Sequence, residues 1–167
     1  GRKVAPRQVR GLVLAPTREL ARQIHDVLEG LARGTHLKFA LVTGGVGFTP
    51  QIEKLARGVA VLIATPGRLL DLADRRAVDL STTRFLVLDE ADQMLDMGFI
   101  HALRRISALL PRERQTMLFS ATMPKDMEEV SRAYLTDPVR VQVNPPGQAV
   151  AKIEQSLHFV ARAAKTE

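Results

Sequence analysis

The stretch FLVLDEAD, at residues 85–92, places four apolar residues directly before a segment with three acidic residues in four positions. A short run that is apolar throughout is typical of a strand covered on both faces, as in a parallel sheet between helices. In open parallel sheets, ligands bind beyond the carboxyl ends of the strands. The stretch therefore predicts a buried strand that delivers Asp89, Glu90 and Asp92 to a functional edge.

Similar apolar runs occur on both sides of this stretch. They cover residues 9–15, 39–43, 59–64 and 117–119, with a weaker alternating pattern at Val139, Val141 and Val143. Between the runs, apolar residues recur at helical spacing. These faces consist of Leu20, Ile24, Val27, Leu28 and Leu31, then Ile100, Leu103, Ile106 and Leu110, then Met127, Val130 and Tyr134. Strands that alternate with helices predict an α/β fold with a parallel sheet sandwiched between helices.

The length of 167 residues and the 46% apolar composition suit one domain with an appendage. Pro145, Pro146 and Gly147 interrupt the pattern and are typical of a linker. We therefore expect a domain over residues 1–143 and a linker over 144–149. Residues 150–167 are expected to be the start of a second domain or a tail.

The charge balance favours a polyanionic partner. The chain has 24 Lys and Arg against 18 Asp and Glu, a formal net charge of +6. A general preference for Arg over Lys is the alternative explanation. The absence of cysteine excludes disulfides and thiolate metal sites and suits a reducing, cytoplasmic location. No apolar run approaches the roughly 18 residues that a membrane span requires.

Polar clusters follow the other apolar runs as well. They are PTREL at residues 16–20, GG at 44–45, TPGR at 65–68 and SAT at 120–122. The first three combine hydroxyls, glycines that allow close approach of the main chain, and fork-shaped Arg donors that match phosphate oxygens. Ordinary strand-to-helix turns, with proline marking a helix start, are the alternative interpretation.

The acidic cluster suits nucleotide chemistry. A carboxylate at Asp89 can hold Mg²⁺ through water, and a second one at Glu90 can orient and deprotonate an attacking water. Capping of the next helix is the alternative. The hydroxyls of Ser120 and Thr122 are candidates to hydrogen-bond Asp92, or else to cap a helix that starts near residue 124.

Taken together, PTRELA, GG, TPGR, DEAD and SAT, in this order over residues 16–122, resemble the successive motifs of the first RecA-like domain of DEAD-box RNA helicases. Within that family, QMLDMGF at residues 93–99 and the later Pro138-Val139 resemble the bacterial RhlE branch most.

The resemblance implies a RecA-like fold, ATP and Mg²⁺ as cofactors, and ATP-driven local unwinding or remodelling of RNA. Asp89 would hold Mg²⁺, Glu90 would activate the hydrolytic water, and Asp92 would couple the nucleotide site to Ser120 and Thr122. The RNA backbone would be bound, without sequence preference, by Pro16, Thr17, Arg18, Gly44, Gly45, Thr65, Gly67 and Arg68. A helix over residues 69–73 would press on the RNA and bend it. Implied partners are single-stranded or duplex RNA, a second RecA-like domain, and ribosomal or RNA-decay complexes.

The sequence departs from the family pattern at its start. Residues 1–10 match neither the adenine-reading glutamine segment nor the Gly-rich loop that ends in Gly-Lys-Thr. We therefore expect residues 1–143 to be a partial first domain that lacks the phosphate-loop strand and helix and does not hydrolyse ATP alone. We expect the missing strand to sit beside the Asp89 strand, so that part of the sheet is open to pairing or aggregation. An RNA-binding module without chemistry and a DNA-unwinding motor stay open as alternatives.

Overall fold

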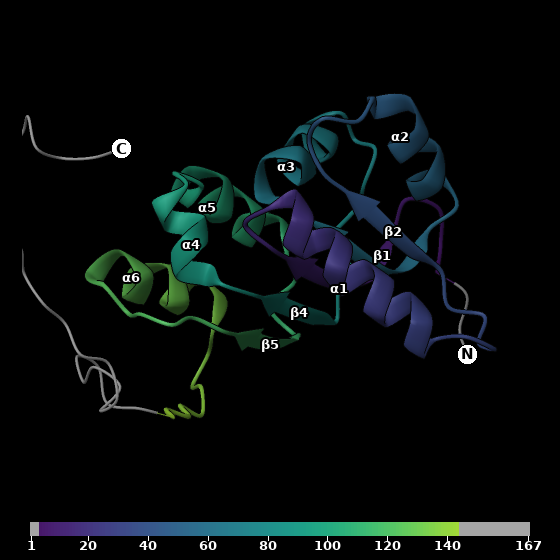
Figure 1. The fold of residues 1–167 in the computed structure, drawn as a ribbon. Helices are drawn as coiled ribbons and strands as arrows, with labels where there is room; N and C mark the ends of the chain where they lie inside the picture. The colour runs from purple at the N-terminus through teal and green to yellow at the C-terminus, as the bar shows by residue number, and fades with distance from the viewer. Residues whose placement is uncertain (1–3, 144–167) are drawn as a thin grey trace, which may run out of the picture.

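The computed structural model describes residues 4–143 of the chain (Figure 1). The predicted linker and second-domain start, at residues 144–167, lie outside the described residues. Five parallel strands form one sheet in the order β2-β3-β1-β4-β5. The strands are β1 (Val9–Leu14), β2 (Phe39–Val42), β3 (Val59–Ala64), β4 (Phe85–Leu88) and β5 (Gln115–Leu118). The α/β class and the parallel sheet are confirmed.

Every strand is followed by a helix, as the sequence pattern predicts. The helices are α1 (Arg18–Leu31), α2 (Phe48–Ala56), α3 (Pro66–Asp74), α4 (Ala91–Asp96), α5 (Ile100–Leu109) and α6 (Lys125–Tyr134). Two of them begin with residues that suit a helix start. Thr17 caps α1 by accepting a hydrogen bond from the Leu20 N–H at 3.2 Å, and Pro66 is the first residue of α3.

The sheet lies between two apolar cores, because successive strand residues point to opposite faces. The larger core contains Leu12, Leu14, Leu62, Leu86 and Leu88 from the strands and buried residues of α2 to α6. The smaller core contains Val13 and Ile63 against Ala21 of α1, which crosses the other face of the sheet (Figure 1). The sandwich of helices on both faces is therefore confirmed.

The single helix α1 covers its face only in part. Phe85 of β4 is 53% exposed, and Met117 and Phe119, in and just after β5, are 48% and 53% exposed. Within α1, Leu20, Ile24 and Leu28 pack on the sheet. Val27 and Leu31 were predicted on the same face, but both are exposed. They lie four residues apart and so form a separate row along α1, next to the packed one, which the sheet does not cover.

Two further expectations were wrong. The strand that ends before Asp89 has hydrogen-bonded neighbours on both sides, β1 and β5. Within the described residues, the outer strands of the sheet are β2 and β5. A further strand can therefore pair with β2 or β5 but not with β4. Val139, Val141 and Val143 lie outside any strand and are 84–92% exposed, so their alternation buries no face.

The strand ends form one row across the sheet. Val42 pairs with Ala64, Ala64 with Leu14, Leu14 with Leu88, and Leu88 with Leu118. Each is the last residue of its strand, so the segments that follow all leave the sheet at the same edge. The five polar clusters therefore lie along one edge of the sheet. Among residues 4–143, no helix is long and apolar enough to cross a bilayer.

Candidate functional site

The functional edge has two halves that correspond to the strand order. Strands β2, β3 and β1 lead into the GG, TPGR and PTREL clusters. Strands β4 and β5 lead into the acidic cluster and the SAT cluster. Groups suited to phosphates therefore lie side by side along one half of the edge, and carboxylates with their hydroxyl partners lie along the other.

The carboxylate half is built around Asp92. The N–H and the hydroxyl of Thr122 both donate to Asp92 Oδ2 at 2.9 Å, and the Gln93 N–H donates to Oδ1 at 3.1 Å. Ser120 Oγ accepts from the Asp92 N–H at 3.2 Å and donates to the Thr122 carbonyl at 2.7 Å. The segment after β5 is thereby joined to the first turn of α4.

These contacts separate the roles of the two hydroxyls. Thr122 makes the predicted hydrogen bond to the Asp92 carboxylate, whereas Ser120 contacts the backbone N–H of Asp92. Neither residue caps α6, because the N-cap of α6 is Pro124 and has no side-chain capping bond. Ser120 instead satisfies one of the N–H groups that the first turn of α4 leaves without a helical partner.

Asp92 is held as a carboxylate. Partial burial by itself raises the pKa of this carboxyl group, but the hydroxyl and amide of Thr122 and the amide of Gln93 lower it. The net result is a pKa below the ordinary value of 3.8. The group therefore accepts hydrogen bonds from Thr122 at every pH near neutrality.

Glu90 lies in a strained part of the backbone. Its φ of 49° and ψ of 53° are left-handed, a conformation uncommon for residues other than glycine. It occupies the N-cap position of α4, but its side chain makes no capping bond, so the capping alternative does not account for its carboxylate. Left-handed non-glycine residues cluster at functional sites.

Asp89 fits one kind of metal site. This half-buried residue follows β4, and its Oδ1 accepts a hydrogen bond from the Glu90 N–H at 3.0 Å. Within the described part of the chain, no three acidic or histidine side chains could together enclose a metal ion. Magnesium is usually bound by one or two carboxylates together with waters and substrate phosphates. A single hard oxygen donor such as Asp89 suits that arrangement and not an all-protein cage.

In the other half, the PTREL and TPGR clusters are strand-to-helix junctions, as the alternative interpretation states. Thr17 is the N-cap of α1, and Thr65 is the N-cap of α3 without a side-chain capping bond. Pro16 is buried, while Arg18 is exposed and extends from α1 toward the next cluster. Both junctions also present a helix N-terminus, which favours an anion.

The GG cluster forms a turn between β2 and α2, at residues 44–46, that Arg18 and Arg68 both contact. Gly45 has a φ of 78°, and a Cβ atom there would collide with the Arg18 guanidinium. Arg18 Nη1 lies 3.5 Å from the Gly44 carbonyl, and Arg68 Nη1 donates to the Val46 carbonyl at 2.6 Å. The structure thus brings the three clusters of this half together at one turn.

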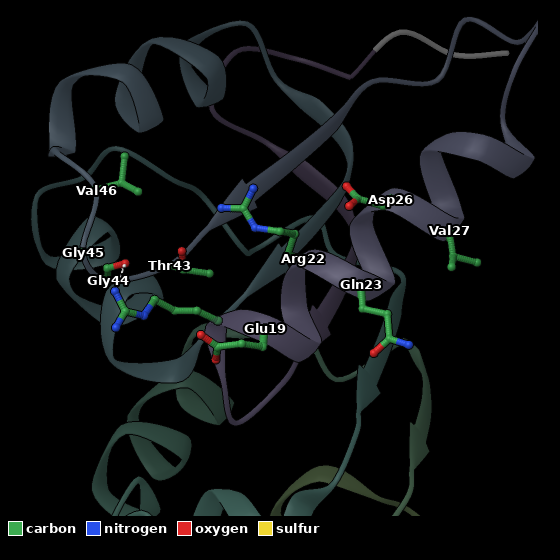
Figure 2. A pocket seen from close by; sticks show the side chains of 10 residues that line it. Glu19, Arg22, Gln23, Asp26, Val27, Thr43, Gly44, Gly45 and Val46 are labelled. Carbon is green, nitrogen blue, oxygen red and sulfur yellow. Dashed lines mark hydrogen bonds between the residues drawn. The ribbon is translucent and has the colours of Figure 1, made fainter.

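An open hollow of about 670 Å³ lies between α1 and this turn (Figure 2). Two cations, Arg18 and Arg22, and two acids, Glu19 and Asp26, line it. Sequence reasoning missed Arg22, although an Arg one helical turn after Arg18 is a signal for a second cation on the same helix face.

Sequence reasoning also missed a group of side chains behind the turn. Gln51 is buried, and the ring of Phe48 lies 4.1 Å from the Arg68 guanidinium carbon and 4.0 Å from that of Arg75. The available signal was an amide on the buried face of a helix, since Gln51 is one turn before the fully buried Leu55.

Comparisons with known proteins agree with this arrangement. The family model for DEAD/DEAH box helicases matches residues 3–130. The chain is 42% identical to the RNA helicase CrhR of Synechocystis sp. and 44% identical to the ATP-dependent RNA helicase DDX47 of Drosophila melanogaster. These matches cover 92% and 93% of this chain but only 31% of each relative.

Solved structures show the same likeness. The crystal structure of a DEAD box protein from the hyperthermophile Methanococcus jannaschii superposes with a TM-score of 0.74 and 38% identity, covering 78% of this chain and 36% of that one. A hypothetical ATP-dependent RNA helicase from Sulfolobus tokodaii gives a TM-score of 0.73 at 38% identity, over 77% of this chain and 39% of the other.

Proposed function

The chain belongs to the DEAD/DEAH box helicase family, and on this premise we propose that it forms the RNA-binding and magnesium-positioning part of an ATP-dependent RNA helicase. The full-length protein would couple ATP hydrolysis to local unwinding or remodelling of RNA. The 167 residues contain no Gly-Lys-Thr sequence, the element that grips nucleotide phosphates in P-loop hydrolases. By themselves, these residues are not expected to hydrolyse ATP.

The observation that carries the proposal is the row of strand ends. It sets a half suited to phosphate backbones beside a half that presents Asp89, Glu90 and Asp92. The test is ATP hydrolysis by the full-length protein with single-stranded RNA, with DNA of the same sequence, and with neither. Hydrolysis should be stimulated by RNA and not by DNA. Equal stimulation by DNA would favour a DNA motor, and RNA binding without hydrolysis would favour a binding module.

In the carboxylate half, we propose that Asp89 holds Mg²⁺ through water and that Glu90 activates the water that attacks the terminal phosphate. Held there, Mg²⁺ would supply positive charge that neutralises the phosphates. The hydrogen bond from the Glu90 N–H orients Asp89 and leaves its Oδ2 for a metal-bound water. Glu90 carries an exposed carboxylate at the start of α4, where it can accept a proton from water.

Asp92, Ser120 and Thr122 are proposed to couple the nucleotide site to strand separation. The support is the hydrogen-bonded link between the start of α4 and the segment after β5. A displacement of either segment must change these hydrogen bonds, because hydrogen bonds are short and directional.

In the other half, we propose that one RNA strand is bound through its sugar-phosphate backbone. The proposed contacts are Pro16, Thr17, Arg18, Gly44, Gly45, Thr65, Gly67 and Arg68. Contacts of this type carry no base information, so binding would be independent of sequence. The convergence of three clusters on one turn supports the assignment.

We further propose that α3 presses on the RNA and bends it. Leu69 and Leu72 are fully buried, so only the opposite face of α3 is available for RNA. At the far end of the helix, Asp74 pairs with Arg105 of α5 at 2.7 Å, but both side chains are exposed, so this ion pair adds little. The buried leucines fix α3 on the core, and a helix fixed in this way can resist the strand that it bends.

We also propose a branch of the family, a cellular location and partners for the full-length protein. Membership of the RhlE branch is supported by QMLDMGF at residues 93–99 and by Pro138-Val139. A cytoplasmic location is supported by the absence of cysteine. A second RecA-like domain and ribosomal or RNA-decay complexes are proposed as partners on the family resemblance alone.

A further inference from the structure

Gln51 is a buried polar residue that belongs to none of the recognised motifs. It lies in α2 and is 5% exposed. Its Nε2 donates to the Thr43 carbonyl at 2.9 Å, and its Oε1 accepts from Arg68 Nη1 at 3.3 Å. Both ends of the amide are therefore engaged, and buried amides engaged at both ends have one orientation.

Three helices hold the turn at residues 44–46 through its carbonyl groups. Gln51 of α2 donates to the carbonyl of Thr43, just before the turn, and Arg68 of α3 donates to that of Val46. Arg18 of α1 approaches the carbonyl of Gly44 at 3.5 Å. The carbonyl oxygens of Thr43, Gly44 and Val46, which would repel a phosphate, are thus paired with donors.

The amide side of the same turn is not engaged. Among residues 4–143, no hydrogen-bond acceptor is found for the N–H groups of Gly44 and Gly45, and Gly45 is exposed. Successive backbone N–H groups in a turn form concavities that bind anions. The turn therefore has two N–H groups available to an anion, while the carbonyls of Gly44 and Val46 are paired with arginine side chains.

Arg68 is fixed by the same group of side chains. Besides Gln51 and the Val46 carbonyl, its guanidinium carbon lies 4.1 Å from the centre of the Phe48 ring, within the range of a cation–π contact. Phe48 and Gln51 stand three residues apart on α2 and so share one helix face. This face of α2 sets where the guanidinium lies.

We propose that Gln51 is a positioning residue for RNA-backbone binding. It holds the turn at residues 44–46 and the Arg68 guanidinium in the arrangement that grips phosphates, and it does not touch RNA itself. The inference rests on the proposed function. A prearranged site loses less conformational freedom on binding, so removal of Gln51 weakens RNA affinity and leaves ATP affinity unchanged.

The test uses the full-length protein with Gln51→Met, a side chain of similar length without the amide. Affinity for a fluorescein-labelled oligouridine strand is measured at several salt concentrations. We expect roughly ten-fold weaker binding and a salt dependence reduced by about one phosphate contact. Arg68→Met should do the same, and the double variant should bind little more weakly than either. Gln115→Met is the matched control, because Gln115 is an exposed glutamine at the opposite end of the strands.

Several outcomes would overturn the inference. One is that Gln51→Met binds RNA as tightly as the wild type while Arg68→Met binds it weakly. Another is that the loss of RNA affinity in the double variant equals the sum of the losses in the two single variants. If neither Arg18→Met nor Arg68→Met weakens RNA binding, the proposed function of this edge fails instead. Should Gln51→Met lose its circular dichroism signal, Gln51→Glu carries the test, since it keeps an acceptor for Arg68 but cannot donate to Thr43. Retained RNA affinity in Gln51→Glu would then overturn the inference.

Discussion

Thr122 contacts Asp92 twice, through its hydroxyl and through its backbone N–H, and both donate to the same carboxylate oxygen at 2.9 Å. The two residues are thirty positions apart and follow neighbouring strands, β4 and β5. Their contact joins the start of α4, which carries the proposed catalytic carboxylates, to the segment that leads into α6. We therefore expect a displacement of one segment to alter its hydrogen bonds to the other.

Thr122→Val removes the hydroxyl donor with little change in shape. We expect a loss of roughly 1 kcal/mol of stability, because a hydrogen bond to a charged acceptor is lost at a partly exposed site. Duplex unwinding per ATP hydrolysed should fall further than ATP hydrolysis itself. Urea unfolding and paired unwinding and hydrolysis assays check this. Thr136→Val, at an exposed position outside the site, should change neither quantity. An equal effect there would contradict the coupling role.

The pH dependence of stability provides a second test. Since folding lowers the pKa of Asp92, its contribution is complete above the ordinary value of 3.8 and is lost as the pH falls through the lower folded value. The stability difference between the wild type and Asp92→Asn should be constant near neutrality and shrink below that value. Urea unfolding across this range measures it. A difference that grows on acidification would contradict the proposed hydrogen bonding.

The left-handed backbone at Glu90 predicts a trade-off between stability and activity. Glu90→Gly should stabilise the fold by roughly 1 kcal/mol, since glycine adopts this conformation without steric cost, and should abolish ATP turnover. Arg76→Gly is the matched control, because Arg76 is also left-handed, with a φ of 56°, but lies past the end of α3. The Arg76→Gly variant should gain a similar stability and keep the ATP turnover of the wild type. Denaturant unfolding and ATPase assays separate the two effects.

Gly45→Ala tests the turn between β2 and α2. The added Cβ meets the Arg18 guanidinium at a positive φ, so we expect RNA affinity to fall about ten-fold as the turn and Arg18 shift. Gly34→Ala has the same backbone strain, with a φ of 81°, but open space around the new atom. Fluorescence anisotropy with labelled RNA should show weaker RNA binding for Gly45→Ala and not for Gly34→Ala. Equally weak binding in both variants would mean that backbone strain, and not the contact with Arg18, causes the loss.

Much of the fold follows from local sequence. Short apolar runs predict β3 and β4 at their observed bounds, because buried parallel strands need no alternation. The parallel register then places all five clusters at one edge. Local sequence cannot predict how far α1 covers its face, so the exposure of Val27 and Phe85 was missed.

The limits of sequence reasoning at the site have a similar cause. Residues with unusual chemistry at strand ends, such as Asp89 and Arg18, stand out in a sequence. Gln51 does not, since its importance lies in a contact with Arg68 seventeen positions away and with a carbonyl that any residue could supply. The strain at Glu90 is equally invisible, because it arises from the path of the chain between β4 and α4.

The most direct test of the central claim, that this edge holds the ATPase chemistry of an RNA helicase, is Glu90→Gln in the full-length protein. Glutamine keeps the size of the side chain but cannot take a proton from water. RNA-stimulated ATP turnover should be lost, while ATP and RNA affinities stay close to those of the wild type. Turnover retained at the wild-type rate would contradict the account.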